Sequence, residues 1–292
     1  MRKRLEACGN KQRRKPSPEA KQRPPGPLFS AYILKAANGK RPNSTWMYEP
    51  QLCFSRADPE MQPLPYPMVD NNIIESQAVL DDYKNSNYTK GHLNPSMHQE
   101  TQINRMATFT LTNIVPQRAG SNSGSWNELE QEVLRLFKKV CVGSMYVITG
   151  ALPHINTHKW VNNRVLIPEY MWSAYCCPVY NNSLSNRGHF PTYAAVGRND
   201  RHSDQEIVPI NPQKKSSKQG YDVRRMSLEA LEEVLSQKLG TTISLFQDQC
   251  QPNAALQQPH DYSNGSPMVK CSPLSSVIWP IMVNWAMGWT IL

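Results

Sequence analysis

Apolar residues recur at helical spacing in two segments of the chain, residues 126–140 and residues 227–239. In the first segment apolar side chains line one face and charged side chains the other, which is typical of a helix that packs on a core. The apolar positions are Trp126, Leu129, Val133, Leu136, Phe137 and Val140. The second segment repeats leucines at the same spacing and is followed by Gly240, a residue that favours the end of a helix. Both segments are therefore predicted to be amphipathic helices.

Shorter runs rich in β-branched and aromatic residues predict strands before and after the first of these helices. The expected strands cover residues 29–34, 106–111, 144–149, 164–167, 170–176 and 192–196. The first strand leads to Asn38-Gly39, a strong turn signal. Strands on both sides of a central helix predict an α+β fold with a mostly antiparallel central sheet and flanking helices.

One folded domain between two tails is the expected organisation of the 292 residues. The first tail, residues 1–28, carries nine basic residues against two acidic ones, so it accounts for +7 of the net charge of +9 and leaves +2 for the rest of the chain. A tail rich in Lys, Arg and Pro is expected to be disordered, as a solvated arm, a nuclear signal or a sticky arm. The body, residues 29–249, is nearly neutral, so bulk charge gives no argument for a nucleic-acid groove.

The second tail, residues 250–292, loses periodicity and ends in an apolar segment that begins at residue 277. That segment has sixteen residues, fewer than the ~20 that span a bilayer, and Pro280 and Asn284 interrupt it. It is expected either to dock on protein or to associate with a membrane surface. The residues after Met1 lack the apolar stretch of a signal peptide.

Seven cysteines occur without a CxxC pair, which argues against zinc-knuckle and thioredoxin-type motifs. Cys176 and Cys177 are neighbours, and neighbouring cysteines rarely bridge each other without strain. If oxidised, each would need a distant partner, so a disulfide framework and buried free thiols both remain open. Four Asn-x-Ser/Thr sequences fit a secretory route, at Asn43, Asn87, Asn181 and Asn264.

Candidate chemistry is concentrated between residues 88 and 130, in a Lys-Gly-His sequence and the amide-rich stretch that precedes the first helix. The candidate residues are Lys90, His92, Asn113, Gln117, Asn122 and Glu130. A histidine titrates near neutral pH and can act as a general base. An amide oxygen suits Mg²⁺, and a lysine can offset the charge of a phosphate. Together these residue types fit the cleavage of a phosphodiester bond.

The spacing of these residues resembles that of the DNA/RNA non-specific endonucleases of the ββα-metal type. In that family an Asp-Arg-Gly-His motif carries the general base, and a later Asn, Asn, Trp, Glu series holds the metal ion and its surroundings. Here Asn122 follows Asn113 by nine positions, and Trp126 and Glu130 follow at intervals of four. The sequence over roughly residues 29–199 is also similar to the vertebrate endonuclease domain-containing 1 proteins within this family.

The resemblance implies roles for the residues that would act directly on the substrate. His92 would be the general base, and Asn122 would be the ligand of a Mg²⁺ ion, with Mn²⁺ as a tolerated substitute. Lys90 would contact phosphate. Arg41 lies at approximately the place of a second phosphate-contacting arginine, although the loop around it varies in length.

Supporting roles are implied for Glu130, Asn113 and Gln117, which would order the water shell of the ion. Two positions depart from the family pattern, because Thr89 stands where the family has aspartate and Lys90 where it has arginine. Threonine can form hydrogen bonds but carries no charge. Lysine keeps the charge and loses the planar fork that grips phosphate with two bonds. We expect reduced or altered activity from these replacements rather than a dead site.

The resulting expectation is a Mg²⁺-dependent endonuclease that binds DNA and RNA through the phosphate backbone and hydrolyses both with little sequence preference. One alternative is a catalytically weakened or inactive nuclease-fold protein that binds nucleic acid or protein. Another is a membrane-associated interaction protein held by the apolar C-terminal tail. The resemblance implies a secreted or membrane-linked protein, although this chain begins without a signal peptide.

Overall fold

The computed structural model describes residues 26–250, apart from residues 38, 66, 155–156, 185–188, 217 and 248–249, together with residues 290 and 291. Most of both predicted tails therefore lies outside the described residues. The predictions of a disordered basic arm and of an apolar C-terminal segment concern these parts of the chain. Within the described residues, no helix combines the length and the apolar character needed to cross a bilayer.

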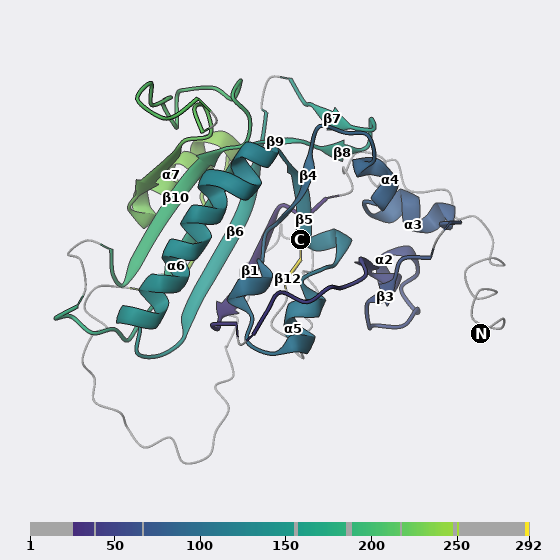
Figure 1. Ribbon diagram of the computed structural model, residues 1–292, viewed down its shortest axis with the longest axis horizontal. Coiled ribbons are helices and arrows are strands. Elements are labelled where there is room, and N and C mark those ends of the chain that lie inside the picture. Colours follow the sequence, from purple (N-terminus) through teal and green to yellow (C-terminus); the bar gives the residue numbers. More distant parts are fainter. Residues whose placement is uncertain are drawn as a thin grey trace, which may run out of the picture.

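Six strands form one sheet in the order β11-β10-β9-β6-β1-β12 (Figure 1). They are β1 (Phe29–Leu34), β6 (Met145–Pro153), β9 (Pro168–Cys176), β10 (Thr192–Arg198), β11 (Val223–Met226) and β12 (Thr290–Ile291). Neighbouring strands pair antiparallel throughout. The strands predicted at residues 29–34, 144–149, 170–176 and 192–196 all lie in this sheet, so the predicted α+β fold with an antiparallel central sheet is confirmed.

One helix covers each face of the sheet: α6 (Trp126–Val140) and α7 (Leu228–Leu239), the two predicted amphipathic helices (Figure 1). Side chains alternate between the faces along β9. Met171 and Tyr175 belong to the apolar cluster under α6, whereas Tyr170 and Trp172 belong to the cluster under α7. The sheet is therefore buried on both sides.

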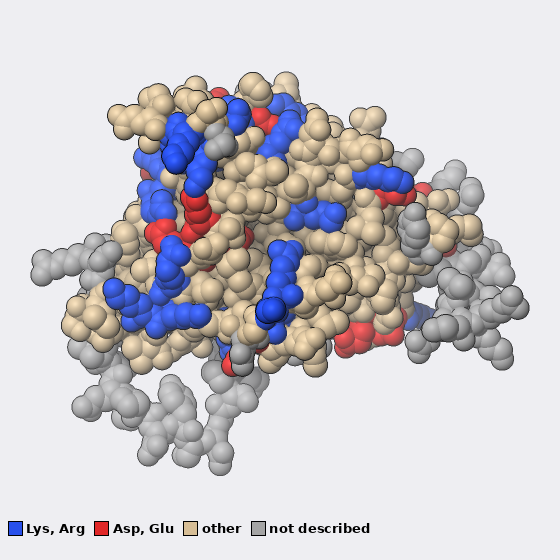
Figure 2. All heavy atoms as spheres, in the orientation of Figure 1, with Lys and Arg blue, Asp and Glu red and all other residues tan. Residues whose placement is uncertain are grey.

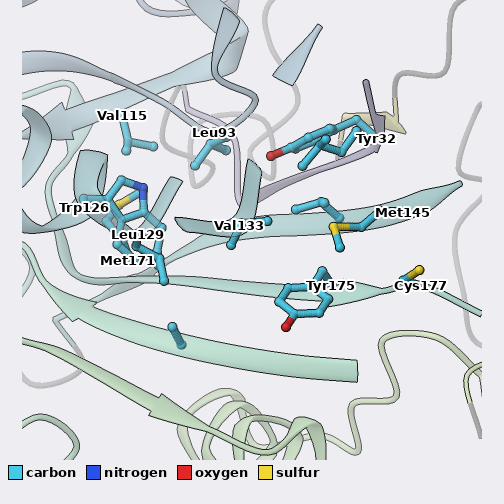
Figure 3. Packing of buried hydrophobic residues seen from close by; sticks show 13 residues of the cluster. Tyr32, Leu93, Val115, Trp126, Leu129, Val133, Met145, Met171, Tyr175 and Cys177 are labelled. Atoms are coloured by element: carbon cyan, nitrogen blue, oxygen red, sulfur yellow. The ribbon is translucent and has the colours of Figure 1, made fainter. Parts of the chain in front are cut away.

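The apolar face of α6 supplies much of the first cluster (Figure 3). Trp126, Leu129 and Val133 are nearly inaccessible to solvent and pack with the sheet residue Met171. The Trp126 ring lies so close to Gly197 that a Cβ atom there would come within 2.8 Å of it. Removing a buried side chain of this size typically costs ~3–5 kcal/mol, so this face fixes the position of the helix.

A two-stranded ribbon lies beside the central sheet and leads into α6. It consists of β4 (Thr89–His92) and β5 (Ile114–Gln117), which pair antiparallel. The connection from β5 to α6 is a single π-helical turn, η4 (Ser121–Ser125). The chain thus follows the strand, strand, helix order that the resemblance implies.

The segment between β4 and β5 is helical and not the strand predicted at residues 106–111. Its elements are η2 (Ser96–His98), α5 (Gln102–Ala107) and η3 (Leu111–Asn113). Thr108 and Thr110 donate hydroxyl hydrogen bonds of 2.7 Å to the carbonyl oxygens of Arg105 and Ala107. These local bonds turn the backbone, which is why β-type residues do not form a strand here.

A third apolar cluster fills the space between the ribbon and several short elements. These are β2 (Met47–Tyr48), β3 (Gln62–Pro63), α2 (Pro50–Cys53), α3 (Asn71–Ser76), α4 (Leu80–Tyr83), β7 (Trp160–Val161) and β8 (Val165–Leu166). The strand predicted at residues 164–167 corresponds to β8, outside the main sheet. Asp82 is buried in α4 and accepts a 2.8 Å hydrogen bond from Arg164, which ties α4 to the β7–β8 hairpin.

Two disulfides link the end of β9 to two segments that follow the helices on either face of the sheet. Cys177 pairs with Cys141, the residue that caps the end of α6. Cys176 pairs with Cys250, which follows α7 along the chain. Adjacent residues of an extended strand point in opposite directions, so two neighbouring cysteines can reach partners on opposite faces. In the structure these four cysteines are therefore paired rather than free thiols.

Candidate active site

The ribbon holds the Lys-Gly-His sequence in an extended conformation, with Thr89 opposite Gln117 and His92 opposite Ile114. Because side chains alternate along a strand, Lys90 and His92 project from the same face of β4. Gly91 lies against the side chain of Gln117, and a Cβ atom at this position would come within 2.7 Å of the Gln117 Cβ. The glycine of the motif is thus required by a close approach of the paired strand.

His92 is 8% exposed and packs against two aromatic rings. The ring centroids of Trp46 and Phe109 are 5.6 and 5.3 Å from that of His92, and Phe109 meets it edge-on at 83°. The His92 Nε2 atom is buried without a hydrogen-bond partner. Burial, assisted by the nearby positive charges of Arg41 and Lys90, lowers the pKa of His92 to about 3. The imidazole is therefore neutral at pH 7 and can accept a proton.

The two cations beside His92 rest on aromatic faces. The Arg41 guanidinium carbon lies 5.1 Å from the Phe109 ring centroid, and the Lys90 Nζ lies 5.4 Å from the Trp46 ring centroid. Both charges act on the histidine, so the site combines a neutral base with two positive groups. On the face shown in Figure 2 the basic side chains form separate groups with acidic ones among them. That face carries no continuous basic surface.

Asn122 is held next to β4 by its side-chain amide. Its Nδ2 atom donates to the Thr89 hydroxyl at 2.9 Å and to the Lys90 carbonyl at 3.4 Å. The Thr89 hydroxyl donates its single proton to the Gln117 carbonyl at 2.7 Å, so towards Asn122 it can only accept. This fixes the orientation of the amide. The Asn122 Oδ1 atom has no hydrogen-bond partner among the described residues and remains able to bind a cation.

Asn113 and Gln117 support the backbone around the histidine. Asn113 donates to the carbonyl oxygens of Asn94 and Thr108 and accepts from the Asn94 amide, at 2.9–3.0 Å. Gln117 donates to the Ser121 hydroxyl at 2.8 Å, and its Oε1 atom is buried without a partner. These bonds fix the loop after His92 and the turn before α6. A role of either residue in ordering water around an ion stays a prediction.

Glu130 lies on α6, two turns beyond Asn122, and is half-buried as a residue. Burial raises the pKa of this carboxyl to about 8, and the positive charge of Arg41 limits the rise. Glu130 and Arg41 are therefore close enough to interact, which joins the helix to the cation pair beside His92. In the absence of a bound cation the carboxyl group is largely neutral at pH 7.

His98 was assigned no role from the sequence, and the structure places it behind the site. Its Nε2 atom lies 3.0 Å from the Glu130 carbonyl oxygen, which can only accept, so Nε2 carries the proton. Its Nδ1 atom then accepts from the Tyr32 hydroxyl at 2.9 Å. Burial lowers the pKa of His98 to about 4, although the bond to the carbonyl opposes this shift. A neutral histidine thus links β1 to α6 beneath Glu130.

Tyr83, Trp46 and Phe109 were also not identified from the sequence, because single aromatic residues more often belong to a core. The structure brings them to the site from α4, from the residue before β2 and from the second residue after α5, respectively. No motif spacing connects them with His92. Only the third apolar cluster, in which Trp46 and Tyr83 pack, places them there.

The donor set fits a hard cation with a mostly aqueous shell. Among the described residues no group of three or more His, Cys, Asp or Glu side chains is arranged to hold a metal ion. The Asn122 Oδ1 atom, which has no hydrogen-bond partner among the described residues, is available as a protein ligand. Mg²⁺ commonly takes one or two protein oxygens and retains several waters. The residues therefore suit Mg²⁺ or a similar ion better than Zn²⁺, which prefers nitrogen and sulfur ligands.

Comparison with known proteins agrees with the geometry. The model of the DNA/RNA non-specific endonuclease family matches residues 68–234. Endonuclease domain-containing 1 protein of Homo sapiens is 26% identical over 204 residues, which cover 64% of this chain and 38% of that protein. The Mus musculus protein of the same name is 31% identical over 159 residues, or 52% of this chain and 30% of that protein. The chain thus matches less than half the length of these relatives.

Of two further matches, one covers a smaller part of this chain and the other has a lower sequence identity. Mitochondrial endonuclease G of Caenorhabditis elegans is 40% identical over 73 residues, 24% of this chain and 23% of that protein. A crystal structure of an EndoG/EndoGI complex superposes with a TM-score of 0.48 at 20% identity, covering 79% of this chain and 82% of that chain.

Proposed function

Because this chain belongs to the DNA/RNA non-specific endonuclease family, we propose that it is a Mg²⁺-dependent nuclease that hydrolyses phosphodiester bonds of DNA and RNA with little sequence preference. One observation carries the proposal. A neutral histidine, two cations and an oriented amide oxygen are grouped along strand β4 of the β4–β5 ribbon.

His92 takes the role of general base. As the oxygen of a water molecule attacks phosphorus, the imidazole accepts the proton of that water, and the bond from phosphorus to the leaving oxygen breaks. In the free protein the charges of Arg41 and Lys90 help to keep the pKa of His92 low. A phosphate bound by these two cations would offset their charge and so raise the basicity of the imidazole where it is needed.

Asn122 takes the role of Mg²⁺ ligand through Oδ1, because its amide nitrogen is already bound to Thr89 and Lys90. When bound, Mg²⁺ supplies stabilisation for the charge that develops on the phosphate and on the leaving oxygen. Glu130, on the adjacent helix, is assigned the ordering of water in the site, with Asn113 and Gln117 as supports.

Low sequence preference follows from the chemistry of the contacts. Lys90 and Arg41 would bind phosphate, which is the same for every nucleotide and for DNA and RNA. Contacts to phosphate position a nucleic acid without reading its bases. We therefore assign both DNA and RNA as substrates, bound through the backbone.

The test compares the wild-type protein with His92→Ala and Asn122→Ala on plasmid DNA and on structured RNA. We expect the wild-type protein to cleave both in Mg²⁺ and to lose this activity in EDTA. Loss of the general base is expected to lower kcat by about 10²–10⁴-fold. Asn122→Ala is expected to raise the Mg²⁺ concentration needed for half-maximal activity. A wild-type protein without metal-dependent cleavage, or a fully active His92→Ala variant, would refute the proposal.

The second candidate function is a weakened or inactive nuclease fold that binds nucleic acid or protein. Thr89 and Lys90, which replace the aspartate and arginine of the family motif, favour it. Filter binding of a labelled oligonucleotide separates the two functions. Retained binding together with absent cleavage at any Mg²⁺ or Mn²⁺ concentration would support the binding protein.

We propose in addition that the protein passes through an oxidising, secretory compartment. Support comes from the two disulfides and from the exposed positions of Asn43, Asn87 and Asn181, each in a glycosylation sequence. A mass shift on treatment with a glycosidase is the expected result. Membrane association through residues 277–292 stays a separate prediction. It would be refuted if a variant without these residues partitions between soluble and membrane fractions as the full chain does.

A further inference from the structure

Lys90 has no charged partner of its own among the described residues. No carboxylate oxygen in this part of the chain lies within 4.0 Å of its ammonium group, the limit for an ion pair, although six other Lys and Arg side chains form such pairs. A lysine side chain has four rotatable bonds and loses up to ~2 kcal/mol of conformational freedom when it is fixed. Something other than an ion pair must therefore hold this ammonium group beside His92.

Two aromatic rings approach the Lys90 ammonium group from different elements. Its Nζ atom lies 5.4 Å from the ring centroid of Trp46 and 5.9 Å from that of Tyr83. Both distances fall within the range of cation–π attraction, which extends to about 6 Å. Trp46 precedes β2, and Tyr83 ends α4, so the two rings come from segments that are distant in sequence.

Both rings are held by the fold. Trp46 lies 5.4 Å from the Phe109 centroid, and its carbonyl oxygen accepts a 3.0 Å hydrogen bond from the Leu64 amide. Tyr83 is buried in the third apolar cluster, next to Asp82, whose bond to Arg164 ties α4 down. Rings that are already fixed lose little entropy when they receive a cation.

We infer that Trp46 and Tyr83 are positioning residues for Lys90, forming an aromatic cradle that orients its charge towards the scissile phosphate. This inference rests on the proposed function. A π face attracts a cation without neutralising it, whereas a carboxylate would compete with the phosphate for the same charge. The planar fork of an arginine is pre-organised by its own geometry, whereas the ammonium group of a lysine is not. The cradle thereby supplies this orientation to Lys90.

Tyr83 offers the cleaner test, because Trp46 also contacts His92. The Tyr83 hydroxyl is buried without a hydrogen-bond partner, so Tyr83→Phe removes no bond and keeps the ring. Tyr83→Leu removes the ring and keeps a buried apolar side chain. The two variants form a matched pair, and their melting temperatures show whether each is folded.

The first measurement is the ¹H–¹³C spectrum of protein with labelled lysine, assigned by comparison with Lys90→Met. Stacked against two rings, the Lys90 ε-methylene protons are expected to resonate upfield of those of other lysines. Tyr83→Leu is expected to move them towards the common position, and Tyr83→Phe to leave them in place. An unshifted Lys90 signal in the wild-type protein would overturn the inference. This measurement does not depend on whether the protein cleaves nucleic acid.

The second measurement is a double-mutant cycle on cleavage. We expect Tyr83→Leu to lower kcat about tenfold, with a smaller change in KM, and Tyr83→Phe to retain activity close to wild type. In a Lys90→Met background, Tyr83→Leu is expected to have no further effect, because its action passes through the lysine. An equal loss in both backgrounds would show a merely structural role. If the wild-type protein cleaves nothing, the proposed function fails, and the spectrum alone decides whether the cradle exists.

Discussion

The Thr89 hydroxyl is the contact through which the ribbon orients the proposed metal ligand, so its removal tests the site directly. Thr89→Val replaces the hydroxyl with a methyl group of similar size. It removes the 2.9 Å bond from Asn122 Nδ2 and the 2.7 Å bond to the Gln117 carbonyl. The Asn122 amide then keeps only the 3.4 Å contact with the Lys90 carbonyl, which is at the long end for a hydrogen bond.

The size of the effect follows from these two bonds. Each is partly buried, and a net contribution of about 1 kcal/mol per bond predicts a loss of ~2 kcal/mol in the free energy of unfolding. Freed from Thr89, the Asn122 amide can rotate, and Oδ1 spends less time in the orientation that binds a cation. Losses of partners that orient a metal ligand typically weaken metal affinity 10–100-fold. Thr89→Ser keeps the hydroxyl and is expected to remain within a few-fold of the wild type.

Two assays separate binding from catalysis. Electron paramagnetic resonance of free Mn²⁺ measures metal affinity without a substrate, and the Mg²⁺ concentration at half-maximal cleavage measures it during turnover. We expect Thr89→Val to shift both midpoints upward and Thr89→Ser to shift neither by as much. If Thr89→Val binds Mn²⁺ as tightly as Thr89→Ser does, then Asn122 is not oriented by Thr89 or is not the ligand.

The other predictions concern the stability of the scaffold. Because the pKa of His98 is about 4 in the folded protein and about 6.5 unfolded, the unfolded chain binds more protons between these values, and stability falls by up to ~3 kcal/mol as pH drops through this window. His98→Gln is expected to reduce the difference in the free energy of unfolding between pH 7 and pH 4.5, measured by urea titration. An unchanged difference would contradict this assignment. Gly91→Ala is expected to lower the free energy of unfolding by ~1–3 kcal/mol, because the new Cβ atom forces the Gln117 side chain away. The expected signs are a lower melting temperature and weaker cleavage. A stable, active variant would refute the close approach. The double substitution Cys141→Ser and Cys177→Ser removes a disulfide that links residues 36 positions apart, and is expected to lower the free energy of unfolding by about 4 kcal/mol under non-reducing conditions. An unchanged melting temperature would contradict this prediction.

Local sequence determined the regular elements of the fold. The apolar spacing of α6 and α7 predicted both helices, because a helix in a globular protein must bury one face. Ser227 and Gly240 mark the ends of α7: the Ser227 side chain accepts from the Ala230 amide, and Gly240 adopts a left-handed conformation with φ of 67°. Such signals act within a few residues, so a single sequence contains them in full.

Two elements show where local sequence was insufficient. Residues 106–111 have strand-forming composition, yet threonine hydroxyls bond back to the preceding turn. Conversely, β4 has no apolar alternation and was not predicted as a strand. Its extended conformation comes from pairing with β5, some 22–28 positions along the chain. Pairing partners at that distance leave no periodic trace in either segment.

For the site, the Lys-Gly-His sequence and the spacing of Asn113, Asn122, Trp126 and Glu130 predicted the family, which the family model confirms. Tertiary structure alone decided which atom of the Asn122 amide faces outward, since that depends on where the Thr89 proton goes. It also decided that His98 lies between α6 and β1, through hydrogen bonds to Glu130 and Tyr32, which are 32 and 66 positions away. Sequence determines which side chains are present and their local conformation. Their environment, and hence their orientation and basicity, is set by neighbours that only the folded chain brings together.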